Sequence, residues 1–111
     1  MRPPPHVLVT YVQADGSAQT CRLAPGESVM DGALDNGVPG IVAQCGGGCT
    51  CATCHCYVRS PWFERLPEPI ADERDMLAYV AEPRRNSRLS CQVRVTGALD
   101  GMIVDVPERQ A

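Results

Sequence analysis

Two short segments near the N-terminus alternate apolar and polar side chains. Residues 7–12 are rich in β-branched and aromatic side chains, and residues 19–23 resume the alternation after the turn-forming segment 14–17. A period of two places the apolar side chains on one face of a strand. The pattern therefore predicts a β-hairpin over residues 7–23.

The apolar spacing changes to that of a helix after Pro25 and Gly26. Ser28 suits the N-cap, Asp31 follows three residues later as in a capping box, and Gly37 suits the C-terminal stop. The apolar face of this short helix consists of Val29, Met30, Ala33 and Leu34. The sequence thus predicts a helix that crosses the hairpin.

The second half of the chain predicts one further helix and three short strands. The helix covers residues 71–80 and ends before Pro83. Its inward-facing side chains are Met76, Leu77 and Val80. The strands cover residues 57–59, 89–95 and 102–106. This order of elements predicts an α+β fold with a mixed sheet.

The chain has 111 residues, 44% of them hydrophobic, and a formal net charge of −3. These values suit a single domain over residues 7–111, preceded by a short proline-rich lead over residues 1–6. The negative charge disfavours nucleic acid as a partner, because phosphate binding needs clustered basic side chains. We expect a monomer without membrane insertion, since the apolar run over residues 6–12 is far too short to span a bilayer. The basic cluster Arg84, Arg85 and Arg88 is interpreted as a solvated loop.

Seven cysteines are many for a chain of this length, and an odd number does not suit a disulfide framework. The N-terminal residues also have no apolar stretch typical of a secretory signal. We therefore expect the cytoplasm of a bacterium, or the mitochondrial matrix if a transit peptide has been removed. In such reducing compartments, clustered cysteines indicate metal or redox chemistry.

Five of the cysteines lie in the glycine-rich segment 44–56, which has no helical or strand periodicity. The plant-type spacing C-x4-C-x2-C fits no set of them, whereas C-x5-C-x2-C fits one set. That set is Cys45, Cys51 and Cys54. Of the two cysteines outside the segment, Cys21 belongs to a predicted strand, and Cys91 lies beyond the second helix, as expected of a distant fourth ligand. The spacing favours a 2Fe-2S cluster.

Other metal sites fit the sequence less well. A zinc ribbon needs two C-x2-C pairs and the chain has one, a 4Fe-4S run needs C-x2-C-x2-C, and a Rieske centre needs two histidines where only His55 is near. A structural zinc-binding interaction module and an enzyme with a reactive cysteine are the alternatives from other classes. The latter is disfavoured because no Cys-His-carboxylate set is evident and the chain is too short for a separate catalytic domain.

Several residues near the predicted ligands are expected to support the cluster. His55 would orient the loop through hydrogen bonds rather than bind iron. Cys49 and Cys56 are interpreted as small, buried, inert residues, with a replacement-ligand or cluster-delivery role as the alternative. Three glycines would let the backbone wrap closely enough for N–H groups to point at sulfur: Gly46, Gly47 and Gly48.

A series of segments after Val7 keeps the order found in one known family. They are Cys45-Gly46-Gly47, Cys51-Ala52-Thr53-Cys54-His55, Tyr57-Val58, Leu66-Pro67-Glu68-Pro69, Asp75-Met76-Leu77, Ser87-Arg88-Leu89-Ser90-Cys91-Gln92 and Leu99-Asp100-Gly101. The chain resembles the adrenodoxin/putidaredoxin-type 2Fe-2S ferredoxins. The resemblance implies a β-grasp (ubiquitin-like) fold and one 2Fe-2S cluster per chain. It also implies Cys45, Cys51, Cys54 and Cys91 as the ligands.

The same resemblance implies a one-electron carrier that takes electrons from an NAD(P)H-dependent flavoprotein ferredoxin reductase. The expected acceptor is a cytochrome P-450 monooxygenase. Iron–sulfur cluster assembly and a ring-hydroxylating oxygenase are the alternative destinations, because other relatives serve them.

The resemblance further implies partner docking at the second helix, where the helix dipole also favours carboxylates. The predicted docking residues are Asp72, Glu73 and Asp75. Arg74 interrupts this acidic run, and Ala78 stands where adrenodoxin has a further acid. The patch is therefore expected to be weaker than in that relative.

Overall fold

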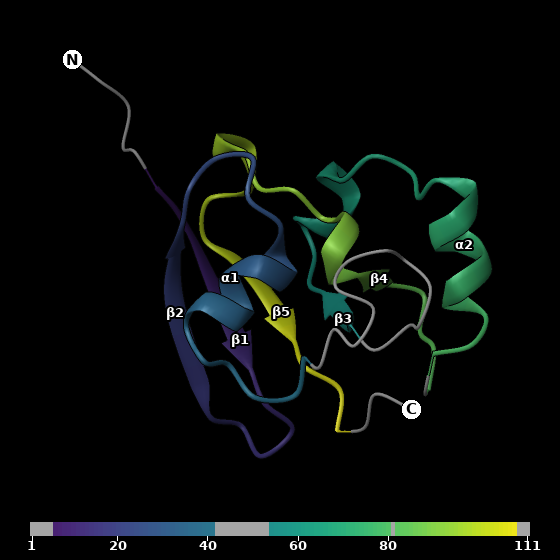
Figure 1. Ribbon diagram of the computed structural model, residues 1–111, viewed down its shortest axis with the longest axis horizontal. Coiled ribbons are helices and arrows are strands. Elements are labelled where there is room, and N and C mark those ends of the chain that lie inside the picture. The colour runs from purple at the N-terminus through teal and green to yellow at the C-terminus, as the bar shows by residue number, and fades with distance from the viewer. Residues whose placement is uncertain (1–5, 42–53, 81, 109–111) are drawn as a thin grey trace.

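The computed structural model describes residues 6–41, 54–80 and 82–108. Within them, five strands form one sheet in the order β2-β1-β5-β3-β4 (Figure 1). β1 (Val7–Val12) and β2 (Ala18–Leu23) make the predicted antiparallel hairpin. β5 (Met102–Asp105) runs parallel to β1 and antiparallel to β3 (His55–Val58), which in turn pairs with β4 (Ser87–Leu89). The predicted α+β fold with a mixed sheet is confirmed.

Helix α1 (Val29–Asp35) covers the hairpin end of the sheet (Figure 1). Its contact with β2 is close at Gly32, where a Cβ atom would lie 2.6 Å from the side chain of Leu23. The buried Tyr11 of β1 reaches the same helix, because its hydroxyl donates a hydrogen bond to the carbonyl of Val29 at 2.8 Å. The helix is thus fixed to the sheet by packing and by one buried polar contact.

Both predicted ends of α1 are confirmed. The hydroxyl of Ser28 accepts a hydrogen bond from the N–H of Asp31 at 3.0 Å. At the other end, Gly37 has φ of +67°. The N–H groups of Gly37 and Val38 bond the carbonyls of Leu34 and Ala33, which is the Schellman pattern.

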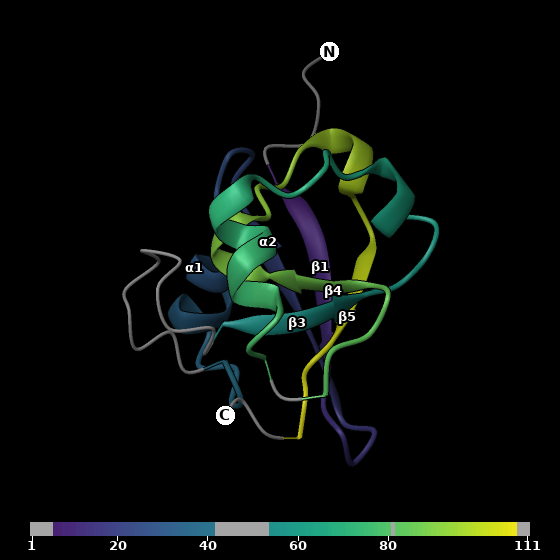
Figure 2. The same ribbon diagram turned by 90° about the vertical axis from the view of Figure 1, so that its right-hand side faces the viewer.

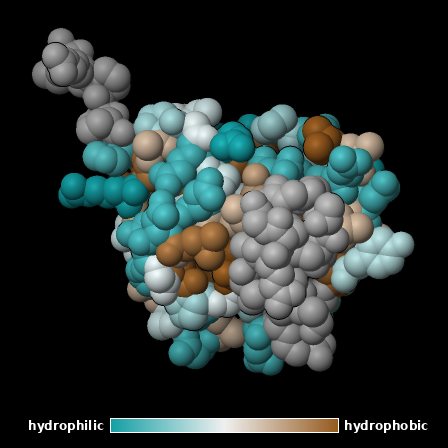
Figure 3. All heavy atoms as spheres, in the orientation of Figure 1, coloured by the Kyte–Doolittle hydropathy of each residue, from teal (hydrophilic) through white to brown (hydrophobic). Residues whose placement is uncertain are grey.

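The predicted apolar face of α1 is wrong at one position. Leu34 is 48% exposed, and Gly32 is buried in the face instead. The approach of Leu23 explains the difference, because only Gly32, which has no side chain, leaves room for Leu23 of the strand. Apolar atoms gather over α1 on the face drawn in Figure 3.

Helix α2 (Ala71–Leu77) lies at the other end of the molecule, beside β4 (Figure 2). It is three residues shorter than predicted. The N–H groups of Ala78 and Tyr79 bond the carbonyls of Asp75 and Met76, three residues back, so the last turn tightens and the helix stops. Val80 is still buried, as its spacing predicted.

Two predicted strands also change. β3 begins at His55 rather than at residue 57, because His55 already pairs with Leu89. The predicted strand over residues 89–95 is wrong. β4 ends at Leu89, and a 3-10 turn, η2 (Ser90–Gln92), follows. Beyond it, Arg94 forms an isolated bridge with Ser28, on the segment that leads into α1.

The diversion at residue 90 has a physical cause. The N–H of Ser90 still bonds the carbonyl of Cys54 at 2.9 Å, in register with the β3–β4 ladder. The turn η2 then closes through the N–H of Val93, which bonds the carbonyl of Ser90 at 3.3 Å. The carbonyl of Val93 in turn accepts from the N–H of Val29 at 2.9 Å. The chain thus leaves the sheet and crosses to the N-terminal end of α1. Two shorter 3-10 turns, η1 (Phe63–Arg65) and η3 (Gly97–Leu99), lie in the connections. Among the described residues, no helix is long and apolar enough to cross a membrane.

Candidate metal centre

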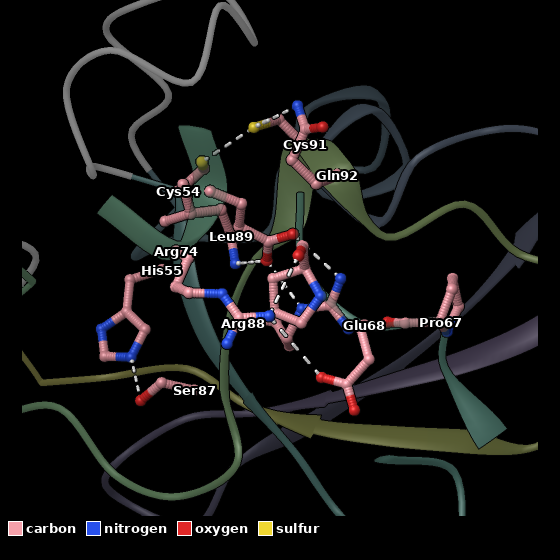
Figure 4. Close-up of polar contacts among 12 residues, drawn as sticks. Cys54, His55, Pro67, Glu68, Arg74, Ser87, Arg88, Leu89, Cys91 and Gln92 are labelled. Atoms are coloured by element: carbon pink, nitrogen blue, oxygen red, sulfur yellow. Dashed lines mark hydrogen bonds and ion pairs between the residues drawn. The ribbon is translucent and has the colours of Figure 1, made fainter. Parts of the chain in front are cut away.

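Two of the four predicted ligands lie in the described part of the chain, and the fold brings them together. Cys54 immediately precedes β3, and Cys91 lies in η2, immediately after β4. The β3–β4 ladder and the hydrogen bond from Ser90 to Cys54 align these two segments. The two sulfur atoms are 3.4 Å apart, and both side chains are buried (Figure 4).

The sulfur separation tests whether this pair fits a metal. A disulfide has sulfur atoms about 2.05 Å apart, much closer than the distance seen here. Two thiolates on one tetrahedral metal, with metal–sulfur bonds of about 2.3 Å, lie about 3.8 Å apart. The observed 3.4 Å is close to this second value. Cys54 and Cys91 are therefore close enough to serve as two thiolate ligands of one metal site.

The other half of the predicted ligand set lies outside the described residues. Cys45 and Cys51 belong to residues 42–53, as do the three predicted loop glycines (Gly46, Gly47 and Gly48) and Cys49. Residues 6–41, 54–80 and 82–108 alone contain no group of three or more histidine, cysteine or acidic side chains placed to bind a metal. A four-thiolate site therefore needs ligands from residues 42–53.

A buried ion pair lies three residues before Cys91. Arg88 donates two hydrogen bonds to the carboxylate of Glu73, at 2.7 and 2.9 Å, and a third to the carbonyl of Pro67 at 2.9 Å. The N–H of Leu89 adds a further bond to Glu73 at 2.9 Å. This set of contacts joins α2 to β4 directly before the segment that carries Cys91.

The ion pair corrects two expectations from the sequence. Glu73 is 1% exposed, so its carboxylate is not on the surface where a docking partner would meet it. Arg88 is 4% exposed and is not part of a solvated loop. Asp72 and Asp75 are exposed, so the predicted docking set is reduced to these two.

The position of Glu73 did leave a signal in the sequence. It precedes Met76, Leu77 and Val80 by three, four and seven residues, which places it on the apolar face of its helix. An acid on such a face indicates a buried partner rather than a surface role. The partner itself, Arg88, had no signal of its own.

His55 is a strand residue, and its side chain is fully buried. Its Nε2 atom lies 2.8 Å from the hydroxyl oxygen of Ser87, across the β3–β4 pair. The N–H of Arg84 donates to the same hydroxyl at 2.8 Å. Burial, with a smaller contribution from the Arg84 charge, lowers the pKa of His55 to about 4. The imidazole is therefore neutral at pH 7. Its contact with the Ser87 hydroxyl joins β3 to β4.

Two further cysteines are buried in the sheet. Cys56 lies in β3 with no exposed surface, and burial raises the pKa of its thiol to about 12. Cys21 lies in β2, is 3% exposed and belongs to the hydrophobic core. Cys56 is thus small and buried, as predicted, and Cys21 is a core residue of its strand.

Comparison with protein families gives a match that covers most of this fold. Residues 12–96 match the family described as the 2Fe-2S iron-sulfur cluster binding domain. Rhodocoxin from Rhodococcus erythropolis is 47% identical over 103 residues, covering 92% of this chain and 96% of that protein. Putidaredoxin from Pseudomonas putida is 46% identical over 103 residues, with the same coverage of both chains.

A solved structure agrees with this family match. Putidaredoxin in a crystal structure of its covalent complex with putidaredoxin reductase has a TM-score of 0.88 and 46% identity, covering 92% of this chain and 99% of that one. Cys54 and Cys91 fit an iron site, and the family match, the relatives and the fold agree. The chain therefore belongs to the adrenodoxin/putidaredoxin-type 2Fe-2S ferredoxins, which carry one 2Fe-2S cluster and act as electron carriers rather than enzymes.

Proposed function

We propose that this ferredoxin carries single electrons from an NAD(P)H-dependent flavoprotein ferredoxin reductase to a cytochrome P-450 monooxygenase. The observation that carries the reductase half is the similarity to putidaredoxin, which has been crystallised in covalent complex with its reductase. The monooxygenase half of the proposal rests on the family resemblance, which implies a cytochrome P-450 as the acceptor. We place the protein in the bacterial cytoplasm, because rhodocoxin and putidaredoxin both come from bacteria.

We further propose Cys45, Cys51, Cys54 and Cys91 as the four cluster ligands. When bound, the cluster supplies a one-electron couple. The chain's own residues have three tasks around it. Cys54 and Cys91 would hold the cluster from two adjacent strand ends, with their sulfur atoms 3.4 Å apart. The Glu73–Arg88 pair fixes the β4 side of this pair, and the buried side chains of β3 and β4 keep water away.

Docking is proposed at the exposed face of α2, through Asp72 and Asp75. Both carboxylates are exposed on the helix whose buried Glu73 holds the Cys91 segment. A basic surface on a redox partner would be attracted to them and guided toward this end of the molecule. Arg74, which lies between them, reduces the local negative charge.

Reconstitution with purified partners tests the electron route. The ferredoxin is mixed with NADPH or NADH, a bacterial ferredoxin reductase and a P-450 of the putidaredoxin-dependent kind, and product formation is measured. We expect turnover that requires all three proteins. Reduction by the reductase without electron delivery to any P-450, but with delivery to a cluster-assembly system or a ring-hydroxylating oxygenase, would overturn the monooxygenase assignment. It would leave the reductase assignment intact.

Single Cys→Ser variants test the ligand set. Substitution of any of Cys45, Cys51, Cys54 and Cys91 should abolish or shift the visible absorption of the cluster. The controls Cys49→Ser and Cys21→Ser should keep the wild-type spectrum. A wild-type spectrum in Cys91→Ser, or loss of the cluster in Cys49→Ser, would show that the wrong cysteine had been chosen.

A further inference from the structure

The side chain of Gln92 turns back onto the sulfur atom of the preceding residue. Its Nε2 atom lies 3.5 Å from the Sγ atom of Cys91, within the range of a hydrogen bond to sulfur (Figure 4). An amide nitrogen has only donor hydrogens, so the sulfur is the acceptor. Among the described residues, this is a side-chain donor directed at a proposed ligand.

The backbone around Gln92 holds this geometry. Gln92 ends the 3-10 turn η2, in which the N–H of Val93 bonds the carbonyl of Ser90 at 3.3 Å. The next residue is tied to α1, since the carbonyl of Val93 accepts from the N–H of Val29 at 2.9 Å. Cys91 and Gln92 thus lie on a short turn that is fixed on both sides. The half-buried position of Gln92 shields its amide in part from competing water.

We propose that Gln92 tunes the reduction potential of this ferredoxin by donating a hydrogen bond to the Cys91 thiolate. A ligand sulfur carries more negative charge after the site takes up one electron. A donor directed at that sulfur therefore stabilises the reduced form more than the oxidised form. Hydrogen bonds to the sulfurs are among the factors that set the potentials of iron–sulfur sites. Gln92 is a positioning residue in this role and raises the potential.

The proposal rests on Cys91 as a ligand, but it does not depend on the identity of the reductase or the acceptor. It deepens the electron-carrier function by naming a side chain that sets how readily the electron is taken up. All its tests use the isolated holoprotein, with dithionite as the electron donor.

The first test replaces the amide by an apolar side chain of similar size, Gln92→Leu. The equilibrium constant for reduction should fall about three- to tenfold, a shift of about 30 to 60 mV toward negative potential for a one-electron couple. The matched control is Gln19→Leu, on the edge strand β2. It removes the hydrogen bond that the Gln19 amide donates to the carbonyl of Asn36. Its potential should equal that of the wild type.

Resonance Raman spectroscopy supplies a readout that a general loss of protein stability would leave unchanged. Exchange into deuterated water shifts iron–sulfur stretching bands when exchangeable hydrogens bond the sulfurs. Part of this shift should disappear in Gln92→Leu and persist in Gln19→Leu. An unchanged potential together with an unchanged deuterium shift in Gln92→Leu would overturn the proposal.

Gln92→Glu covers the case in which the leucine variant does not assemble its cluster. The carboxylate keeps the size of the side chain, removes both donors and adds negative charge, so the potential should fall further at pH 8. A potential equal to or above that of the wild type would overturn the proposal. Failure of the ligand assignment is seen separately, because Cys91→Ser would then keep its wild-type spectrum.

Discussion

At the scale of single residues, the site depends on contacts that join distant parts of the chain. Glu73 and Arg88 are 15 positions apart, yet they form a two-bond ion pair with side chains 1% and 5% exposed. Glu73 also accepts from the N–H of Leu89, so every one of its contacts reaches the strand that leads to Cys91. A carboxylate predicted to dock partners instead organises the interior.

Removal of the Glu73 charge should therefore act on stability rather than on partner binding. In Glu73→Gln, Arg88 is left as a buried charge without its counter-ion, and we expect the free energy of unfolding to fall by about 3 kcal/mol. Denaturant unfolding of the holoprotein, followed by visible absorption, measures the change. The matched control Asp72→Asn lies one position earlier on the exposed side and should change stability by less than about 1 kcal/mol. Equal effects in the two variants would contradict the buried role.

The signals that the residues leave in the sequence differ in kind. Cysteine spacing predicts Cys54 as a ligand, because a cluster needs thiolates at defined intervals, and Cys91 is predicted from its place beyond the second helix. The fold brings these two side chains together. The family resemblance predicts a surface role for Glu73, whereas its position on the apolar face of the helix agrees with the buried role that the structure shows. Gln92 left no signal in the sequence, since the direction of its amide toward the sulfur is seen only in the structure.

At the scale of elements, α1 follows closely from local rules. Its N-cap, its Schellman end and most of its apolar face are set by residues within a few positions of each other. Elements in the second half of the chain depend on contacts with residues that are distant in the sequence. β4 stops at Leu89 because the chain turns in η2, and the carbonyl of Val93 then accepts from the N–H of Val29 at the start of α1, which is a tertiary contact.

A pair of glycine substitutions tests the C-terminal stop of α1. Gly37 has φ of +67° with open space around its α-carbon, so Gly37→Ala should destabilise the protein by about 1 kcal/mol through backbone strain alone. Gly97 also has open space but no positive φ, so Gly97→Ala is the matched control and should be close to neutral. Thermal unfolding followed by circular dichroism measures both. Equal melting temperatures for the two variants would contradict the role assigned to the left-handed residue.

At the scale of the whole molecule, the proposed functional residues gather at one end of the sheet. One hydrophobic core runs under the whole sheet, but the two described ligands lie next to β3 and β4, and Asp72 and Asp75 are exposed on the adjacent α2. Charge on α2 therefore lies at the end of the molecule that holds Cys54 and Cys91, while the turn between β1 and β2 lies far from α2 (Figure 1).

This arrangement predicts a position-dependent effect of charge on the reaction with the reductase. Asp75→Asn should slow reduction at low ionic strength by on the order of a few-fold and weaken its dependence on salt, because rim charges act on the association rate. Asp15→Asn, in the β1–β2 turn, changes the net charge equally and should have little effect. Stopped-flow reduction across a salt series distinguishes the two. The same slowing in both variants would indicate a response to net charge and remove Asp75 from the docking surface.

The sequence by itself determined the fold class, the N-terminal hairpin, the limits of α1 and the spacing of the proposed ligands. Each of these depends on residues close together in the chain or on a motif whose intervals are fixed by the chemistry of the cluster. Only the tertiary structure decided that Glu73 is buried against Arg88, that the chain turns away from the sheet at Ser90 and that Gln92 contacts the sulfur of Cys91. The ion pair joins α2 to β4, whereas Ser90 and Gln92 lie in η2. No local pattern of apolar and polar residues specifies which distant group will satisfy a buried charge or a backbone N–H.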